Sequence, residues 1–429
     1  MHLISSVSIE GFWETYDFEV PIDSEVTFFI GQNGTGKTTF INLLAAALTA
    51  DFRTLDRMPF RRISISLAPL TKGEKPIIIV TKSRKKERPF ELIDYRIVPA
   101  GLNAKEVRFS LDDTEEQMIL RRLQHDPRYY EYYHRFQAGL LPELRKLVSV
   151  NWLSIHRTSP MDRPREERAF ESSVDQKLET LSNDLVRYFA TLSKQKDDEI
   201  RAFQEYIFVS LIEHRDDIDP FKADRLYLVE QYSEALKNIF NELHVQRDTS
   251  KLLNDFLERA IKNRDKLGDG KKANSLTMEE LIFRIGLYRI EEVVRRWESL
   301  QDRLKAIFRQ RDKFQSIADQ LFQRKKMSFS PSNELIFNSR SGKPLTPQML
   351  SSGEKQLLIL MSEALLQREM PAIFIADEPE LSLHVLWQEQ LVNSLRALNP
   401  KAQLIAATHS PDIVGTLANK AVDMESLIK

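Results

Sequence analysis

The segment Gly31-Gln-Asn-Gly-Thr-Gly-Lys-Thr-Thr39 is the most informative part of this sequence. It matches the pattern G-x-x-x-x-G-K-[ST], in which a loop follows a buried strand and opens a helix. The short apolar run Val26–Ile30 predicts the strand, and apolar residues from Lys37 to about Leu48 predict the helix. This context predicts a phosphate-binding loop whose contact residues are Gly31, Asn33, Gly34, Gly36, Lys37, Thr38 and Thr39.

The residue types of this loop suit the binding of phosphate groups and of a magnesium ion. Its glycines let backbone N–H groups close around the β- and γ-phosphates, and the helix N-terminus adds favourable partial charge. The ammonium of Lys37 is expected to reach the β- and γ-phosphate oxygens, and the hydroxyl of Thr38 is expected to bind Mg²⁺.

An apolar run that ends in two acids complements this loop. Residues Ala372–Ala376 predict a buried strand, and Asp377 and Glu378 follow it directly. Asp377 can hold Mg²⁺ through water, and Glu378 can orient and deprotonate an attacking water as general base. The pattern is unspecific by itself, but together with the phosphate-binding loop it predicts hydrolysis of a nucleotide.

The segment Leu350-Ser-Ser-Gly-Glu-Lys-Gln356 marks the start of another predicted helix. The backbone groups of its serine and glycine residues can face a phosphate at the helix N-terminus. The alternative interpretation is an ordinary helix whose cap is Ser351 or Ser352. The candidate binding residues of this segment are Ser351, Ser352, Gly353 and Glu354.

A histidine follows the last predicted strand. Thr408-His409-Ser410 comes directly after the apolar residues Leu404–Ala407. A histidine at a strand end behind the two acids can hydrogen-bond the γ-phosphate or the attacking water, although a single histidine is usually structural. His409 is therefore a candidate catalytic residue.

The remaining amino-terminal residues predict mostly β-structure. Residues 2–31 predict strands, and apolar runs within residues 62–110 predict an antiparallel β arm. Residues 112–147 predict helix, with an aromatic cluster at 128–135 that either stacks on nucleic-acid bases or packs against a neighbouring helix, the favoured interpretation. Residues 148–156 predict one more strand.

A long helical insertion is predicted over residues 173–325. Thr277 and Glu280 form a capping-box pattern that opens a helix running to about Phe322. Its apolar positions follow a 4-3-4-3 spacing that is typical of a coiled coil, interrupted by Arg311. The expected partner is the helical run 222–262. The apolar positions of the stripe are Val293, Trp297, Leu300, Leu304, Ile307, Phe314, Ala318 and Leu321.

The order of these elements predicts an α/β fold with a mixed or parallel sheet, helices and an antiparallel β arm, interrupted by a coiled-coil-like insertion. Residues 1–172 are expected to form the amino-terminal lobe and residues 326–429 the carboxyl-terminal lobe, with residues 173–325 between them. A chain of 429 residues is long enough for such a division.

Composition excludes several classes of protein. The net charge is -1, so the whole chain offers no general attraction to nucleic acid. The absence of cysteine excludes disulfides and cysteine–zinc sites. The amino-terminal residues lack the pattern of a signal peptide, and no apolar run is long enough to span a membrane. The expected localisation is cytoplasmic.

The motifs together resemble the heads of ABC-type ATPases, and more closely the branch shared by SMC proteins, break-repair ATPases and OLD proteins. The shared order is the phosphate-binding loop, a long helical insertion, LSSGEKQ in place of the signature LSGGQ, DEPELSLH and THS. The resemblance covers about residues 1–60 and 327–415. It implies ATP and Mg²⁺ as cofactors and a homodimer that holds ATP between two subunits.

The resemblance also implies individual roles. Ser351 and Gly353 would contact the γ-phosphate held by a second subunit, Ser382 would lie on the D-loop, and His409 would be the switch histidine. His384 replaces the usual D-loop aspartate, and Glu354 replaces the signature glutamine. Gln176 is a candidate for the Q-loop glutamine, but with Ser173 it also fits a capping box, which is the favoured interpretation.

Three functions are compatible with this resemblance. The first is an anti-phage defence ATPase that forms a homodimer or a larger homo-oligomer, responds to a phage protein or DNA, and controls a separate effector. About 20 residues follow His409, too few for the TOPRIM nuclease of OLD proteins. Chain length and the early phosphate-binding loop favour the PARIS type, with a TOPRIM nuclease partner, over the Septu type, with an HNH nuclease partner.

The second function is that of an SMC-like DNA-repair or DNA-maintenance ATPase, for which a basic run near the first lobe supplies the DNA contacts. Such runs are more often solvated surface. The third, the ATPase subunit of a membrane transporter, is disfavoured by the helical insertion and the unplaced Q-loop. The basic residues are Arg53, Arg57, Arg61, Arg62, Lys82, Arg84, Lys85, Lys86 and Arg88.

Overall fold

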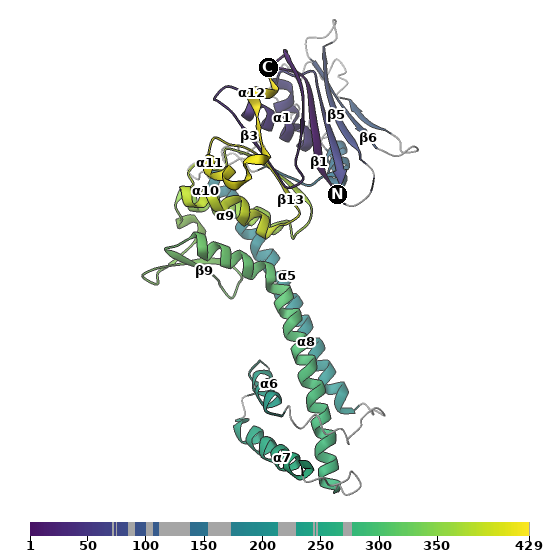
Figure 1. The fold of residues 1–429 in the computed structure, drawn as a ribbon, viewed down its shortest axis with the longest axis vertical. Coiled ribbons are helices and arrows are strands. Elements are labelled where there is room, and N and C mark those ends of the chain that lie inside the picture. The colour runs from purple at the N-terminus through teal and green to yellow at the C-terminus, as the bar shows by residue number, and fades with distance from the viewer. Residues whose placement is uncertain are drawn as a thin grey trace, which may run out of the picture. The chain divides into compact units, whose positions relative to one another are not determined.

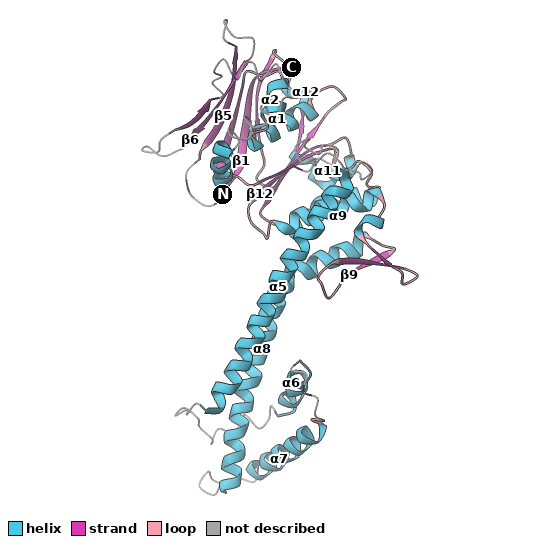
Figure 2. Cartoon of the chain, turned by 180° about the vertical axis from the view of Figure 1, so that it is seen from behind, coloured by secondary structure: helices cyan, strands magenta, loops and turns pink. Residues whose placement is uncertain are grey.

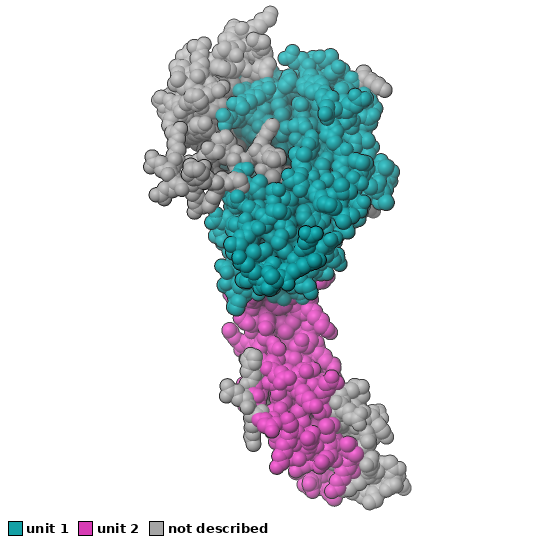
Figure 3. All heavy atoms as spheres, turned by 90° about the vertical axis from the view of Figure 1, so that its left-hand side faces the viewer, with its two compact units in different colours: residues 1–187, 310–429 teal, residues 188–309 magenta. Residues whose placement is uncertain are grey.

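The computed structural model describes residues 1–70, 73, 75–84, 91–99, 106–110, 138–152, 173–212, 229–242, 245, 248–268 and 277–428. They form two compact units, one of residues 1–187 and 310–429 and the other of residues 188–309 (Figure 3). The division falls inside two long helices, α5 (Ser173–Ile212) and α8 (Met278–Leu321).

A parallel sheet forms the centre of the first unit, and its three central strands are almost wholly buried. Continuous apolar runs are typical of such strands because both faces of the sheet are covered. In the described part of the chain the strand order is β14 (Ala421–Asp423), β3 (Val26–Ile30), β13 (Ala402–Ala407), β12 (Ala372–Asp377) and β8 (Val150–Trp152).

A second, antiparallel sheet contains the predicted β arm. Its strand β4 alternates buried and half-buried residues, which places one face against the core. Because β4 also pairs with β1, these strands are continuous with the first strands of the chain. The order is β2 (Tyr16–Pro21), β1 (His2–Phe12), β4 (Arg62–Pro69), β5 (Ile77–Arg84), β6 (Glu91–Val98) and β7 (Val107–Ser110).

Helix α1 (Lys37–Thr49) packs in one apolar core with strands of both sheets (Figure 1). Phe40 and Leu44 of this helix share the core with Ile63 of the antiparallel sheet and Ile405 of the parallel sheet. Most residues of α1 are apolar and buried, as is typical of a helix that is enclosed by other elements. The α/β fold class predicted from the sequence is confirmed.

Shorter elements complete the first unit. Residues 138–147 are helical, and a small antiparallel sheet follows α8. The remaining elements are α2 (Phe52–Arg57), β9 (Lys325–Phe329), β10 (Leu335–Ser339), β11 (Pro344–Leu345), α9 (Ser352–Leu366), α10 (Val385–Leu398), α11 (Pro411–Val414) and α12 (Met424–Leu427).

The second unit is helical, as predicted. The capping box before α8 is present, because Thr277 N donates to Glu280 Oε2 at 2.9 Å and Glu280 N donates to Thr277 Oγ1 at 3.3 Å. In this unit α5 lies beside α8 (Figures 1 and 2), and Phe203 of α5 packs against Trp297 with ring centroids 5.6 Å apart.

The helical run over residues 222–262, the expected partner of α8, does pack against it, since Tyr232 and Ala260 share a cluster with Leu287 of α8, but it is not the whole partner. Two helices, α6 (Val229–Glu242) and α7 (Ser250–Gly268), occupy this region. Ile239 of α6 joins Phe203 of α5 in covering Trp297 and Leu300 of α8. The stripe on α8 therefore faces more than one helix, which heptad spacing alone does not reveal.

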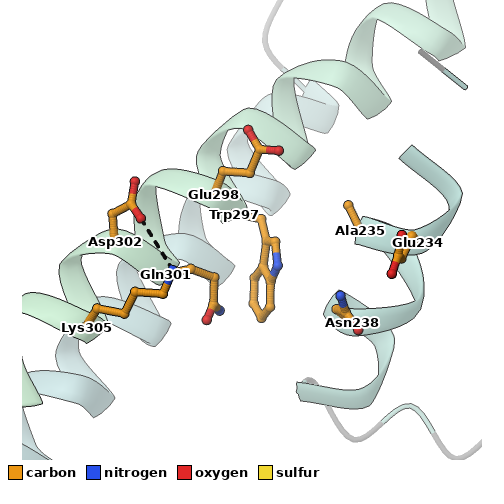
Figure 4. A pocket seen from close by; sticks show the side chains of 8 residues that line it. All are labelled: Glu234, Ala235, Asn238, Trp297, Glu298, Gln301, Asp302 and Lys305. Atoms are coloured by element: carbon orange, nitrogen blue, oxygen red, sulfur yellow. Dashed lines mark ion pairs between the residues drawn. The ribbon is translucent and has the colours of Figure 1, made fainter. Parts of the chain in front are cut away.

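A shallow pocket of about 290 Å³ lies between α6 and α8 in this unit (Figure 4). The ring of Trp297 lines it, together with three carboxylates and one ammonium, and Lys305 pairs with Asp302 at 3.9 Å. The lining residues are Glu234, Ala235, Asn238, Trp297, Glu298, Gln301, Asp302 and Lys305.

Some sequence predictions lie outside the described residues. These are the aromatic cluster at 128–135, most of the helix at 112–147, the end of the strand beyond residue 152, and Lys85, Lys86 and Arg88 of the basic run. Among the helices of the described ranges, none combines the length and apolar character that a membrane span requires.

Candidate nucleotide-binding site

The phosphate-binding loop lies between β3 and α1, as the motif predicts. Gly36 caps α1 with a φ of 90°, in the left-handed region that favours glycine. A Cβ atom at Gly36 would lie 2.9 Å from the ring of Phe12. Glycine is therefore required here by both the backbone conformation and the space. The loop leaves Asn33, Gly34 and Thr38 exposed to solvent.

The ammonium of Lys37 lies inside the loop. It donates hydrogen bonds to the carbonyl oxygens of Gly31 and Gln32, each at 2.8 Å. Burial lowers the pKa of Lys37 below its ordinary value, and the nearby carboxylates, Glu378 first and then Asp377, offset part of this effect. The carbonyl oxygens of the loop itself thus hold the ammonium in place.

Thr38 and Asp377 meet at the mouth of the loop. Thr38 Oγ1 donates to Asp377 Oδ1 at 3.0 Å and joins α1 to the end of β12. One hydroxyl and one carboxylate are oxygen donors of the kind that Mg²⁺ prefers, and this ion keeps several water ligands in protein sites. The pair therefore fits a magnesium ion held beside a nucleotide.

The parallel sheet explains why these residues meet. Strands β3, β13 and β12 are neighbours, and their residues Phe29, Ala407 and Asp377 lie side by side in register. The segments after parallel strands lie at one edge of the sheet, where ligands bind in open α/β folds. The phosphate-binding loop, the two acids and the Thr408–Ser410 segment all lie at this edge.

Glu378 and His409 face each other at this edge. His409 Nε2 lies 3.9 Å from Glu378 Oε1, and both side chains are partly exposed. Glu378 has a φ of 48°, which residues other than glycine rarely adopt, and its N–H donates to the carbonyl of Ala407 at 2.8 Å. The structure thus brings together the two candidate catalytic residues from β12 and β13.

The LSSGEKQ segment begins α9, and the cap interpretation describes its geometry. Ser351 is the N-cap and forms a capping box with Glu354, whose carboxylate accepts from Ser351 N at 2.8 Å. Burial raises the pKa of Glu354, but hydrogen bonds from Lys325 and Ser351 outweigh it and leave the pKa below its ordinary value. Ser351 and Ser352 remain exposed.

The start of α9 packs tightly against the turn that follows β12. A Cβ atom at Gly353 would lie only 2.3 Å from the carbonyl oxygen of Ser382, which itself has a φ of 69°. Gln356 Nε2 donates to the carbonyl of Pro379 at 2.9 Å. The start of α9 and the turn after β12 are therefore one packed structure.

Gly353→Ala is expected to lower the free energy of unfolding by about 1–3 kcal/mol, because backbone atoms must move to admit the methyl group. Gly286→Ala is the matched control. A Cβ atom at this position in α8 meets nothing within 4 Å, so alanine should leave stability unchanged or raise it by up to about 1 kcal/mol. Urea denaturation followed by circular dichroism compares the two variants, and equal stabilities would contradict the close packing of Gly353.

His384 and Gln176, whose roles the resemblance to ABC-type ATPases leaves open, both lie at the start of a helix. His384 is the N-cap of α10, and its Nδ1 accepts a hydrogen bond from Leu386 N at 3.3 Å. An aspartate could cap the helix in the same way. Ser173 is the first residue of α5, and the carbonyl of Gln176 accepts from Thr180 Oγ1 at 3.0 Å.

Sequence analysis did not assign a role to Glu380. In the structure its Oε1 accepts hydrogen bonds from Thr408 Oγ1, His409 N and Ser410 N, at 2.6, 2.9 and 3.2 Å. The only signal in the sequence is a third acid close behind Asp377 and Glu378. Glu380 and the Thr408–Ser410 segment are about 30 residues apart in the sequence, so no local pattern predicts their contact.

The parallel sheet, the loop between β3 and α1 and the acids at the end of β12 define an α/β ATPase of the P-loop class. The chain belongs to the AAA ATPase domain family, whose model matches residues 3–414.

One curated relative is the Retron Vc95 probable ATPase of Vibrio cholerae serotype O1 biovar El Tor, which is 26% identical over 236 residues. The match covers 48% of this chain and 44% of that protein. The aligned part therefore spans less than half the length of the relative.

Among solved structures, the chain is similar to an Smc head domain with an extended coiled coil from Pyrococcus furiosus, with 13% identity and a TM-score of 0.36. That match covers 100% of this chain and 95% of the other. The SMC head domain of Thermotoga maritima gives 10% identity and a TM-score of 0.34, covering 97% and 92%. Such values say nothing of function.

Proposed function

We propose that this protein binds ATP with Mg²⁺ and hydrolyses it between two copies of the chain. The observation that carries the proposal is the meeting of Lys37, Thr38, Asp377 and Glu378 at one edge of the parallel sheet. Membership of the AAA ATPase domain family supports it. The site offers a cation for phosphate, oxygen donors for a metal and a carboxylate for water.

Each residue group has its own role in this proposal. Lys37 and the backbone N–H groups of the loop bind the phosphates, and the candidate contacts include Gly31, Asn33, Gly34, Gly36 and Thr39. Thr38 and Asp377 hold Mg²⁺, which supplies positive charge beside the phosphates when it is bound. Glu378 takes the proton of the attacking water, and His409 contacts the γ-phosphate or that water.

A second copy of the chain completes the site in this proposal. Ser351 and Gly353 contact the γ-phosphate bound to the partner, Ser352 and Glu354 are further candidate binding residues of the same segment, and Ser382 lies between the two sites. The exposure of Ser351 and Ser352 at the N-terminus of α9 supports this arrangement. So do four exposed apolar residues that lie beside this segment, in the turn before α10 and in the first turn of α10: Met349, Leu381, Val385 and Leu386.

We further propose that ATP-driven closure of this dimer, or of a larger homo-oligomer, controls a separate effector nuclease in anti-phage defence. The motif order, which resembles PARIS and Septu ATPases, supports this role. The similarity to a retron ATPase from a bacterium adds weak support. A TOPRIM nuclease is the preferred effector and an HNH nuclease the alternative, and a phage protein or DNA would be the trigger.

Affinity purification of the tagged chain from its host tests this proposal. We expect Mg²⁺-dependent ATP hydrolysis and a co-purifying nuclease, whose sequence by mass spectrometry distinguishes the TOPRIM and HNH types. Phage challenge should produce toxicity with the wild-type chain and none with Lys37→Ala. ATP hydrolysis without a bound nuclease and without phage-dependent toxicity would contradict the defence role alone.

The alternative of direct DNA binding receives less support. Within the described residues, Arg61 pairs with Asp17 at 3.1 Å and Arg62 pairs with Glu10 at 3.7 Å. Lys82 donates to two backbone carbonyls. Two of these basic residues are therefore paired with acids, and a third is bonded to the chain's own backbone. Salt-dependent DNA binding that stimulates ATP hydrolysis would favour the alternative.

A further inference from the structure

We propose that Glu380 is a positioning residue that fixes His409 relative to Glu378, and this proposal rests on the ATPase function given above. Glu380 lies in the turn between β12 and α10, whereas His409 follows β13. Its carboxylate is the link between these two segments. The role concerns how the site is assembled, because Glu380 acts on the reacting groups only through His409.

A single oxygen of Glu380 organises the whole Thr408–Ser410 segment. Oε1 accepts from Thr408 Oγ1 at 2.6 Å, from His409 N at 2.9 Å and from Ser410 N at 3.2 Å. Hydrogen bonds to an ionised acceptor are about twice as strong as neutral ones. The backbone on both sides of the His409 side chain is thereby fixed to the turn after β12.

The contact between Glu380 and the Thr408–Ser410 segment is partly buried, so its polar groups depend on each other for hydrogen bonds. Thr408 is 1% exposed, and Glu380 Oε2 is buried and has no hydrogen-bond partner among the described residues. A buried carboxylate is costly unless hydrogen bonds compensate for lost water. The compensation here comes through Oε1 and the Thr408–Ser410 segment, so neither group can move away without leaving the other unsatisfied.

The turn that carries Glu380 is itself held by the start of α9 and by α10. Gln356 Nε2 donates to the carbonyl of Pro379 at 2.9 Å, and Gln388 Nε2 of α10 donates to the carbonyl of Leu383 at 2.9 Å. Glu378 and Ser382 in the same turn have left-handed φ values of 48° and 69°. A strained turn keeps its shape only when its surroundings determine it, so the position of His409 is coupled to α9.

The consequence concerns turnover rather than ATP binding. His409 Nε2 lies 3.9 Å from Glu378 Oε1, a distance that a small movement or one water molecule bridges. A misplacement of about 1 Å can cost about 100-fold in rate. Lys37 is held by the carbonyls of Gly31 and Gln32 rather than by the turn that carries Glu380, so affinity for ATP should change little.

The test compares Glu380→Ala and Glu380→Gln in the wild-type chain and in a His409→Ala background. Glu380→Ala should lower kcat about 10- to 100-fold with KM changed less than about twofold. Glu380→Gln should recover part of this loss, since its amide oxygen still accepts the two backbone N–H groups. Glu389→Ala, an exposed glutamate of α10, is the matched control and should keep the wild-type rate.

The double variant separates positioning from general destabilisation. If Glu380 acts through His409, Glu380→Ala should lower kcat by less than about twofold once His409 is alanine, because coupled residues are not additive. A full additional loss in that background, or a raised KM with unchanged kcat, would overturn the proposal. Glu380→Gln keeps the side-chain volume and provides the same comparison if the alanine variant unfolds.

Failure of this inference is distinguishable from failure of the proposed function. If the wild-type chain does not turn over ATP, the proposed ATPase function is contradicted. If His409→Ala turns over ATP normally, the proposed roles of His409 and Glu380 are both contradicted. If His409→Ala is slow and the effects of the His409 and Glu380 substitutions are fully additive, only the positioning role of Glu380 is contradicted.

Discussion

Lys37→Ala is expected to weaken ATP binding at least about 100-fold and to reduce hydrolysis to background. Charge-assisted hydrogen bonds contribute about 1.5–3 kcal/mol each, and the ammonium is expected to make more than one with the phosphates. The same ammonium also bonds to the carbonyls of Gly31 and Gln32. Its removal therefore also loosens the loop that must close around the phosphates.

The measurement is titration of the purified variant with a fluorescent ATP analogue, together with phosphate release. Lys401→Ala is the matched control, because Lys401 is an exposed lysine in the turn before β13. It should bind and hydrolyse ATP as the wild type does. A Lys37→Ala protein that melts at the wild-type temperature and still binds ATP normally would remove Lys37 from the site.

Glu378→Gln is expected to lower kcat by about 100- to 10,000-fold, the range for loss of a general base. Binding of ATP should persist, because the phosphate-binding loop is intact and glutamine preserves the shape of the side chain. The closed state then has no route to hydrolysis, so the ATP-bound dimer should accumulate. Lys37→Ala and Glu378→Gln therefore fail at different steps.

Size-exclusion chromatography with light scattering, with and without ATP and Mg²⁺, measures the trapped dimer. Glu334→Gln, the same charge change at an exposed residue between β9 and β10, should behave as the wild type. Normal turnover in Glu378→Gln would show that another group removes the proton. A monomer under all conditions, with turnover lost, would contradict the shared site and leave the role of Glu378 intact.

Local patterns in the sequence predicted the elements around the site well. The strand at Val26–Ile30 and the helix from Lys37 are present at the predicted positions, as are the strands that end at Asp377 and Ala407. Each is a short apolar run with a turn signal beside it, which hydrophobic periodicity detects. The capping box at Thr277 is equally local, since its bonds span three residues.

Pairing between distant segments was less predictable. The pattern of α8 indicated a packed stripe and the run 222–262 as its partner, but Trp297 is covered from α5 as well as from α6. Apolar spacing shows which face of a helix is buried and leaves the identity of its neighbours open. Arg311, which interrupts the apolar stripe, also contacts a residue outside α8, because its guanidinium lies 5.3 Å from the ring centroid of Phe329 in β9.

The sequence by itself determined the phosphate-binding loop, because Gly36 and Lys37 act through backbone conformation and charge within one short segment. Only the tertiary structure decided how that loop is completed. The approach of Gly353 to Ser382 and the bond from Glu380 to the Thr408–Ser410 segment depend on the register of parallel strands and the packing of α9. These contacts join residues far apart in the chain, and no local pattern records the distance between them.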